Sequence, residues 1–500
     1  MEIKSWRQLF KTKSIDTLIQ EGEEPTHQLK RVLGSFDVVM LGIGAIVGAG
    51  IFATIGTAAA GDMSRPGAGP ALMLSFVITA VACGFAALCY AEFASMVPIS
   101  GSAYTYSYST LGELIAWIIG WDLIIEYAVG NVAVAISWAN YFKTFVSGFG
   151  IIIPDWMSID YRTASKIPGL LEHAPHIFGI PIVFNLPAFS IIAFITFILV
   201  LGIKESARFN TIMVLIKLVV LGIFVAVGFF YMKPQNWTPF APNGWSGIQA
   251  GAAVVFFAYI GFDAVSTVAE EVKNPKRDLP VGIIGSLIVC TIIYILVAAV
   301  FTGIIPYHAL VKTLATSQAE PLTLAIQYAN IEKWGNFLVG VIAFGSVIAH
   351  TAVLLVFQLG QPRIFFSMAR DGLLPESFAK VHPKFKTPYV PTILTGLVVG
   401  VTAMFTTIDE MVDLTNIGTL FAFILVCLGI IILRRREPNR PRAFKTPFVP
   451  LIPILGIIAC FYLILGLPEI TYLRFAGWLI IGMIIYFFYG YKRSKIRNVS

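Results

Sequence analysis

Charged residues are scarce in this chain: of 500 residues only 13% are Asp, Glu, Lys or Arg, whereas 57% are hydrophobic and the mean hydropathy is +0.81. A soluble domain carries roughly 25% charged residues, so the composition excludes an ordinary water-soluble protein. The five cysteines show no CxxC or metal-ligand spacing. Outside the apolar runs there is also no nucleophile–base constellation or phosphate-binding loop. We therefore expect no enzyme, no cofactor and no metal site.

The chain also lacks a basic segment interleaved with aromatic residues, so its net charge of +7 does not indicate a nucleic-acid partner. Most Lys and Arg residues fall in loops that face the cytoplasm if the N-terminus lies inside, as the positive-inside rule requires. The first 35 residues are polar and show no secretory signal. We therefore predict a cell-membrane protein with a cytoplasmic segment at 1–35, a membrane domain at 36–490 and a short cytoplasmic tail at 491–500.

Hydrophobic residues occur in runs long enough to cross the roughly 30 Å hydrocarbon core of a lipid bilayer. Twelve such runs predict twelve transmembrane helices, and no long polar linker divides them into separate domains. Nothing in the sequence indicates an oligomeric state. The runs lie near residues 36–60, 69–97, 112–146, 187–203, 208–232, 247–269, 281–304, 335–360, 390–406, 414–433, 449–467 and 475–490.

The first run is uncharged, yet residues 38–61 contain six glycines. Each interior glycine costs a helix about 0.5 to 1 kcal/mol relative to alanine, so this run predicts backbone that leaves the helix at mid-membrane. Unwound backbone survives at that depth only where it lines a cavity. Freed amides and carbonyls, beside two half-helix ends of opposite partial charge, suit a ligand that bears both a carboxylate and an amine.

The sixth run is irregular as well, because residues 256–264 read FFAYIGFDA, with a glycine and a charged residue in the middle. If spans one and six each open a five-helix repeat, the two repeats enter the membrane from opposite sides. Paired discontinuous helices at matching positions of two halves are typical of the central site of a transporter. No obvious residue identity links the two halves.

Four segments resemble the amino acid-polyamine-organocation (APC) superfamily of permeases, and within it the cationic amino acid transporter branch. They are GIGAIVGAGIF at 42–52, GWDLIIEY at 120–127, FFAYIGFDAVSTVAEEVKNPKRDLP at 256–280 and ARDGLLP at 369–375. The resemblance implies an all-α, LeuT-like membrane fold of two inverted five-helix repeats with discontinuous spans 1 and 6, plus two extra C-terminal helices. It also implies alternating access around a site between spans 1 and 6.

The resemblance further implies which groups of span one bind the substrate. The backbone N–H groups of Ala49 and Gly50, next to Gly48, are expected to meet the substrate carboxylate, and the carbonyl of Ile46 is expected to meet its amine. An exposed half-helix N-terminus attracts an anion, and an exposed C-terminal end attracts a cation, which agrees with this assignment. Many relatives carry Ser or Thr where this chain has Ala49, so a hydroxyl contact is missing here.

On span six, the resemblance implies that the carbonyls of Phe257 and Ile260 complete the shell of the amine. The family places an aromatic lid at the position of Phe257, so we predict that this ring is a gate. His350 in span eight is a further candidate for the substrate pocket. A lone histidine inside a membrane can equally serve as a helix-to-helix hydrogen bond, and the sequence does not decide between the two.

Lys217 lies near the middle of an otherwise apolar run, where insertion costs about 2.5 to 3.5 kcal/mol, so it should face the protein interior. In proton-dependent members of the family, a lysine at this place stands where sodium-coupled relatives hold a sodium ion. We predict that Lys217 exchanges a proton during transport; the alternative is a permanently charged strut between spans one and five. Glu126 and Asp263 are buried carboxylates that could hold protons or act as structural partners.

These features predict a secondary active transporter that imports amino acids and is coupled to protons. An amino acid exchanger or a polyamine carrier is the alternative within transport. A membrane sensor of amino acids is less compatible with the sequence, because the short tail leaves little room for a signalling domain. Whether the side chain of the substrate is cationic, small or branched stays open.

Overall fold

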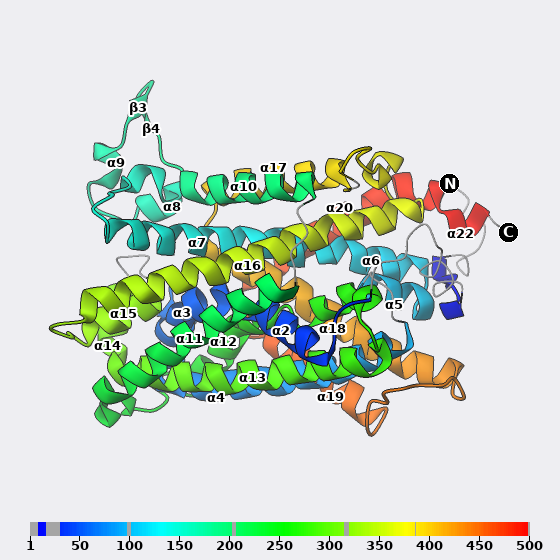
Figure 1. Ribbon diagram of the computed structural model, residues 1–500, viewed down its shortest axis with the longest axis horizontal. Helices are drawn as coiled ribbons and strands as arrows, with labels where there is room; N and C mark the ends of the chain where they lie inside the picture. The colour runs from blue at the N-terminus through cyan, green and yellow to red at the C-terminus, as the bar shows by residue number, and fades with distance from the viewer. Residues whose placement is uncertain are drawn as a thin grey trace.

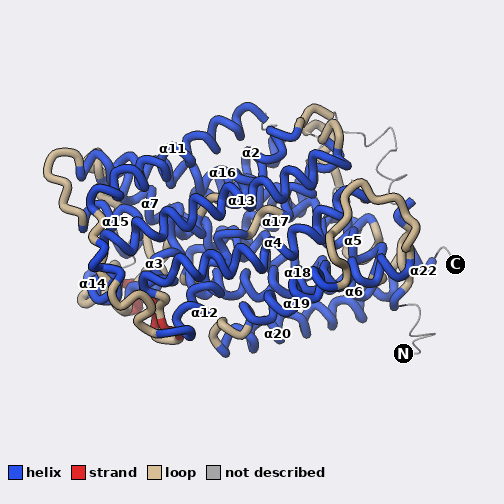
Figure 2. The backbone as a smooth tube through the Cα atoms, turned by 90° about the horizontal axis from the view of Figure 1, so that it is seen from below, coloured by secondary structure: helices blue, strands red, loops and turns tan. Residues whose placement is uncertain are grey.

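The computed structural model describes residues 9–16, 31–97, 102–202, 207–314, 320–385 and 387–498. Within these ranges nearly all regular structure is helical, which confirms the predicted all-α class. Most long helices run along one common axis (Figures 1 and 2). The predicted cytoplasmic segment 1–35 falls only partly in this set, since residues 1–8 and 17–30 lie outside the described residues.

The first half of the chain contains α2 (Ser35–Ile46), α3 (Ile55–Ala60), α4 (Leu72–Met96), α5 (Ser102–Thr110), α6 (Glu113–Ile124), α7 (Gly130–Ser147), α8 (Tyr161–Ala164), α9 (Leu170–His173), α10 (Leu186–Leu201), α11 (Ala207–Tyr231) and α12 (Gly244–Val255). The second half contains α13 (Pro275–Ile304), α14 (Tyr307–Leu314), α15 (Pro321–Tyr328), α16 (Gly335–Arg370), α17 (Tyr389–Phe405), α18 (Ile408–Arg436), α19 (Leu451–Ile464), α20 (Glu469–Ile485), α21 (Tyr491–Arg493) and α22 (Lys495–Asn498). Two short antiparallel ladders pair β1 (Gly61–Asp62) with β2 (Arg65–Pro66) and β3 (His176–Ile177) with β4 (Ile180–Pro181).

The described residues contain eight helices long and apolar enough to cross a membrane, or nine if α2 and the bent segment Gly50–Ala60 form one span. Three shorter apolar helices, α10, α17 and α19, coincide with three other predicted runs. The chain is therefore a multi-pass membrane protein. The number twelve and the inverted repeat stay predictions.

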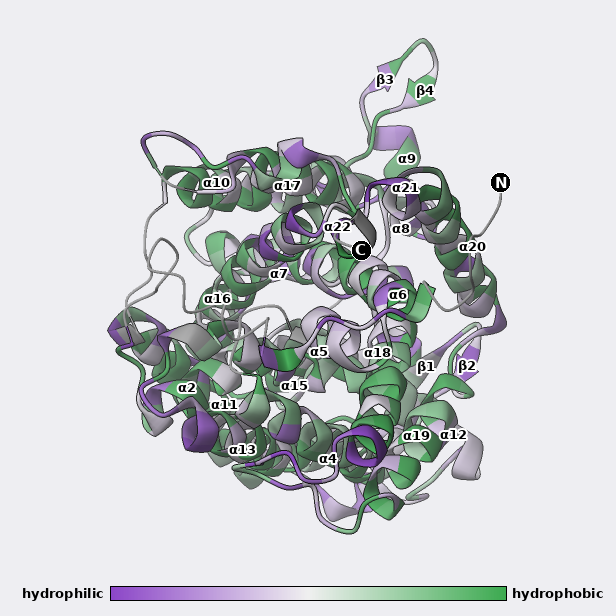
Figure 3. Cartoon of the chain, turned by 90° about the vertical axis from the view of Figure 1, so that its right-hand side faces the viewer, coloured by the Kyte–Doolittle hydropathy of each residue, from purple (hydrophilic) through white to green (hydrophobic). Residues whose placement is uncertain are grey.

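The outer surface of the bundle suits lipid. When the bundle is viewed down its axis, hydrophobic residues cover much of the peripheral helices (Figure 3). Large apolar side chains point outward there, including Phe197 on α10, which is 63% exposed, and Ile484 on α20, which is 52% exposed. In water this surface would cost about 25 cal/mol per Å² of apolar area, so a bilayer is the solvent that fits it.

Both described ends of the chain lie at one end of the bundle, where α22 is labelled in Figure 1. The Lys11 ammonium donates to the carbonyl of Ile496 at 2.7 Å, and the Lys13 ammonium pairs with Asp371 at 3.2 Å. Helices α14 and α15 and the β3–β4 ladder lie at the other end (Figure 1).

Several predicted boundaries were wrong. Helix α16 continues to Arg370, whereas the predicted span ends near residue 360. The polar stretch 147–186, between the third and fourth predicted spans, contains α8, α9 and the β3–β4 ladder, none of which was predicted from the sequence. Hydropathy marks the thickness of the bilayer and not the end of a helix, so a helix that extends into the polar region is not detected.

Candidate functional site

The first span is interrupted at its glycine-rich centre. Helix α2 begins where the N–H of Gly34 donates to the Asp37 carboxylate at 2.9 Å, and it ends at Ile46. Val47 is extended, with φ −77° and ψ 102°. Helical backbone resumes as a π-helical turn at Gly50–Thr54, and the two halves are bent by 40°. The predicted interruption of span one is confirmed.

The sixth span is interrupted as well. Helix α12 ends at Val255 and continues as a 3₁₀ turn, Phe256–Tyr259. Ile260 is extended, with φ −61° and ψ 135°, and Gly261 has φ +119°, a conformation that favours glycine. A second 3₁₀ segment, Asp263–Glu271, follows. The predicted break in span six is therefore confirmed.

The two interruptions meet each other inside the bundle, because the π-helical turn of span one contacts the 3₁₀ turn of span six. A Cβ atom on Gly50 would lie 2.1 Å from the Cα of Ala258. A Cβ atom on Gly261 would lie 2.9 Å from the carbonyl carbon and oxygen of Ala45. The backbones approach this closely only because glycine stands at both contact points.

The inner half-helix of span one is capped by Lys217, which lies on α11 and is fully buried. Its ammonium donates to the carbonyl of Gly44 at 2.7 Å and to that of Val47 at 3.1 Å. Carbonyls in the last turn of a helix lack helical donors and carry partial negative charge, so a cation stabilises them. The predicted position of Lys217, in the interior and beside the broken helix, is confirmed.

Span six has a corresponding cap that the sequence analysis missed. The Asn416 side chain on α18 donates to the carbonyl of Ala253 at 2.8 Å and to that of Val254 at 3.3 Å, in the last turn of α12. Lys217 lies in the predicted fifth span and Asn416 in the predicted tenth. The one signal in the sequence was an amide side chain within an apolar run. An amide there indicates a functional position less strongly than a charged side chain does.

The predicted substrate contacts on span one lie at the break. The carbonyl of Ile46 accepts a hydrogen bond from the Tyr294 hydroxyl at 3.0 Å, which leaves one lone pair. Ala49 and Gly50 are buried and begin the outer half-helix, which has no side-chain cap. The carbonyl of Gly48 accepts from the N–H groups of the next turn, at 3.2 and 3.3 Å. N–H groups at the start of a helix have no helical acceptor and attract anions.

A sequence profile described as amino acid permease matches residues 33–489, which include both interruptions. The chain belongs to the amino acid permease family. Membership confirms the resemblance seen in the sequence, and it makes this protein a transporter and not an enzyme.

Two curated relatives of the permease match it over nearly their whole length, and a third matches over about two thirds of its own length. This permease is 50% identical to the branched-chain amino acid permease BcaP of Bacillus subtilis, and the match covers 98% of this chain and 99% of the relative. Over the same shares it is 44% identical to the methylthioribose transporter of that organism. It is also 36% identical to the vacuolar cationic amino acid transporter 4 of Arabidopsis thaliana, over 86% of this chain and 68% of the relative.

In this permease Phe257 and Ile260 belong to the unwound part of span six and are both buried. The neighbouring Phe256 packs edge-on against Phe423 on α18, with ring centroids 5.7 Å apart. For Phe257 no such ring contact exists within the ranges that the structure describes. No aromatic partner there fixes its ring, although buried apolar residues surround it.

His350 makes the helix-to-helix hydrogen bond that the sequence left open. One ring nitrogen lies 2.6 Å from the Ser137 hydroxyl on α7, and the other lies 2.6 Å from the carbonyl of Ser346. Because a carbonyl only accepts, Nδ1 carries the proton and Nε2 accepts from Ser137. The ring also packs against Phe52 and Tyr141, each at 5.7 Å. Contact of His350 with substrate stays a prediction.

Glu126 and Asp263 are neighbouring carboxyl groups in the interior, and both oxygens of Asp263 and one of Glu126 are buried without a hydrogen-bond partner within the described ranges. Glu126 lies on a π-helical turn, Ile125–Val129, in the middle of the third predicted span, and Asp263 directly follows the break in span six. Both are almost fully buried, and no ion pair links either to a cation within the described ranges. The sequence indicated both residues but not that they are neighbours, because packing between distant spans leaves no sequence signal.

Metal binding receives no support from the described part of the chain. It contains no group of three or more His, Cys, Asp or Glu side chains placed to hold a metal ion.

Proposed function

We propose that this permease imports amino acids with apolar, branched side chains across the cell membrane by alternating access, in symport with protons and with both termini in the cytoplasm. The observation that carries this proposal is the contact between two interrupted helices at the centre of the bundle. Peptide groups at such a break can hold a zwitterion without any charged side chain.

The proposed pose follows from the two half-helix ends. The substrate carboxylate accepts hydrogen bonds from the N–H groups of Ala49 and Gly50, at the positive end of the outer half-helix. Its amine donates to the carbonyls of Ile46, Phe257 and Ile260, where partial negative charge gathers.

The surroundings of the break favour an apolar side chain. A Cβ atom on Gly48 would meet the Val353 side chain at 2.7 Å, and Gly50 lies against Ala258. A cationic side chain would need a carboxylate or several carbonyls in place of these groups. The 50% identical relative is named a branched-chain amino acid permease, which agrees with this preference.

One relative points to a second substrate class. The 44% identical protein is named for methylthioribose, a sugar without carboxylate or amine. Such a ligand gains nothing from the charge separation at the break, and neither does a polyamine, which lacks the carboxylate. Exchange of one amino acid for another remains the alternative mechanism.

Phe257 is proposed as the gate over the bound substrate. Its neighbour Phe256 is held by an edge-on contact with Phe423, whereas no aromatic contact of this kind holds Phe257 within the described ranges. A side chain that has to change rotamer during each cycle needs this freedom.

Lys217 is proposed to couple proton entry to substrate entry. Its ammonium bonds carbonyls of the same break that binds substrate, so a shift of α2 changes its hydrogen-bond partners and with them its affinity for a proton. Glu126 and Asp263 are proposed to hold a second exchangeable proton, because two neighbouring buried carboxylates repel each other when both are charged. One charge that moves through 100 mV yields about 2.3 kcal/mol, enough for roughly fifty-fold accumulation of a solute without net charge.

Uptake into proteoliposomes tests the proposal. We expect labelled leucine to accumulate when the outside is acidic, with competition by isoleucine and valine but not by lysine, putrescine or methylthioribose. Lys217→Gln should abolish accumulation driven by the pH gradient while leucine still binds. Full accumulation by Lys217→Gln would refute coupling through this residue, and preferred uptake of methylthioribose would refute the substrate class.

A further inference from the structure

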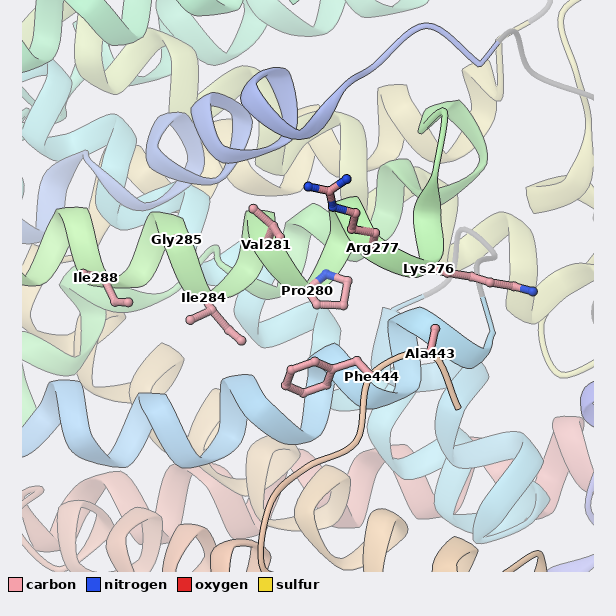
Figure 4. A pocket seen from close by; sticks show the side chains of 9 residues that line it. All are labelled: Lys276, Arg277, Pro280, Val281, Ile284, Gly285, Ile288, Ala443 and Phe444. Atoms are coloured by element: carbon pink, nitrogen blue, oxygen red, sulfur yellow. The ribbon is translucent and has the colours of Figure 1, made fainter. Parts of the chain in front are cut away.

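A groove opens on the outer surface of the bundle between α13 and the segment that joins α18 to α19 (Figure 4). Its volume is about 520 Å³. Pro280, Ile284 and Ile288 line it along α13, and Phe444 lies across from them. Figure 4 shows these apolar side chains on the side of α13 that faces the Phe444 ring. The floor and walls are therefore almost entirely apolar.

Positive charge marks one end of this groove only. Lys276 and Arg277 lie in the first turn of α13, and both side chains are exposed. In Figure 4 the Lys276 side chain extends past the start of α13, away from Ile288, whereas the Arg277 side chain points to the side of α13 opposite the Phe444 ring. In the described ranges neither side chain takes part in an ion pair. Two exposed cations in the first turn of a helix that borders an apolar groove match the headgroup end of an anionic lipid.

The length of the groove matches a single acyl chain. From Lys276 to Ile288 a helix with 1.5 Å rise per residue extends roughly 18 Å. One leaflet contributes about half of the roughly 30 Å hydrocarbon core. A chain that starts at the cations therefore reaches about the middle of the bilayer along this groove.

The wall opposite α13 is held in place by a buried carboxylate. Glu92 on α4 accepts from Arg434 at 2.8 Å and pairs with Arg442 at 3.0 Å. It also accepts from the N–H of Thr446 at 2.8 Å, and the N–H of Phe444 donates to the Ser95 hydroxyl at 3.3 Å. These bonds fix the segment to α4, so the groove belongs to the fold and does not depend on a mobile loop.

We propose that this groove binds one anionic phospholipid of the cytoplasmic leaflet, with its phosphate at Lys276 and Arg277 and one acyl chain along Ile284, Ile288 and Phe444. Clusters of basic residues beside a membrane span on the cytoplasmic side attract anionic headgroups. The proposal uses the orientation with cytoplasmic termini but is independent of the transported substrate. Helix α13 also packs against the interrupted α2, so bound lipid supports the helix that borders the site.

Lipid binding to the purified full-length permease tests this proposal. In detergent, phosphatidylglycerol should bind and raise the melting temperature, whereas phosphatidylcholine should not. Removal of both charges in the double variant K276Q/R277Q should weaken phosphatidylglycerol binding about 30-fold, from the usual contribution of each cation. The matched control K380Q/R435Q removes two exposed cations elsewhere and should bind like the wild type.

A second variant tests the apolar part. Ala443→Trp places an indole in the groove from an exposed position and keeps both cations, so it should fold normally and lose the lipid. Equal binding of the two lipids, or undiminished phosphatidylglycerol binding by the folded K276Q/R277Q variant, would overturn the proposal. Leucine uptake is not the readout, so failure here leaves the transport proposal untouched.

Discussion

At the residue scale, two glycines determine how closely the interrupted helices approach each other. Gly50 lies against the backbone of Ala258, and Gly261 combines a positive φ with contact to the carbonyl of Ala45. Neither position has room for a methyl group. The glycine pattern in the sequence predicted unwinding, but which backbone each glycine would touch depends on long-range packing that the pattern does not contain.

Gly50→Ala tests this close approach. The new methyl group would lie 2.1 Å from Ala258 Cα, so the two turns must separate and we expect uptake to fall at least about tenfold. Gly84→Ala is the matched control, because a Cβ atom on Gly84 meets nothing within 4 Å and alanine is the better helix former. Equal uptake by the two variants would contradict a tight backbone contact.

Single polar residues differ in how well the sequence revealed them. Lys217 was predictable, because a charge in an apolar run must face the interior. Asn416 and Tyr294, which also bond carbonyls at the two breaks, were not, since amides and phenols occur in membrane spans for many reasons. His350 was ambiguous, and its two hydrogen bonds on α7 and α16 show why: both ring nitrogens are occupied by protein.

At the scale of elements, the half-helix that ends at each interruption is held there by a side chain from a different helix. Lys217 on α11 holds the end of α2, and Asn416 on α18 holds the end of α12. Both reach carbonyls in or next to the last turn, where helical donors become scarce. This correspondence supports the predicted inverted repeat, in which the fifth and tenth spans are equivalent.

Asn416→Ala tests the second cap. Loss of the amide leaves two buried carbonyls in the last turn of α12 without this donor, so we expect lower uptake together with a loss of about 1 to 3 kcal/mol in stability. Thr415→Ala is the control, because within the described ranges the Thr415 hydroxyl bonds to its own helix, at the carbonyl of Met411, 2.7 Å away. Thermal unfolding and uptake are measured on the same preparations. If both variants behave alike, the cap has no special role.

Helix α15 lies next to the outer half of span one, where Pro321 borders Gly56. A carboxyl group at the start of this helix should make the stability of the permease depend on pH. Burial raises the pKa of Glu320, just before α15, from 4.5 to about 7. The unfolded chain therefore loses this proton first as the pH rises. The free energy of unfolding should fall between about pH 4.5 and pH 7, by at most about 3 kcal/mol, and stay level above.

Glu320→Gln should remove that decline, because the amide does not titrate. Relative to the wild type, the variant should gain thermal stability between pH 5 and pH 8, as measured by unfolding in detergent. Glu332→Gln serves as control, since Glu332 is exposed on the same side of the molecule. Parallel pH profiles for wild type and Glu320→Gln would show that this carboxyl is not the titrating group.

At the scale of the whole molecule, hydropathy predicted a helical bundle with both ends of the chain on one side, and the described residues agree. It did not predict which helices touch, because every lipid-spanning run looks alike in composition. Polar elements outside the bilayer, such as α8, α9 and the β3–β4 ladder, were missed for a related reason. Short helices in polar segments are stabilised by tertiary contacts and not by a pattern of their own.

Binding of leucine and two analogues to the purified permease tests the central claim most directly, namely that peptide groups at two interrupted helices hold a zwitterion. Leucinamide lacks the carboxylate and 4-methylpentanoate lacks the amine, while both keep the branched side chain. Calorimetry should show saturable binding of leucine and at least about 100-fold weaker binding of each analogue, because either loss leaves charge-assisted hydrogen bonds unmade. Binding of either analogue within a few-fold of leucine would contradict the account.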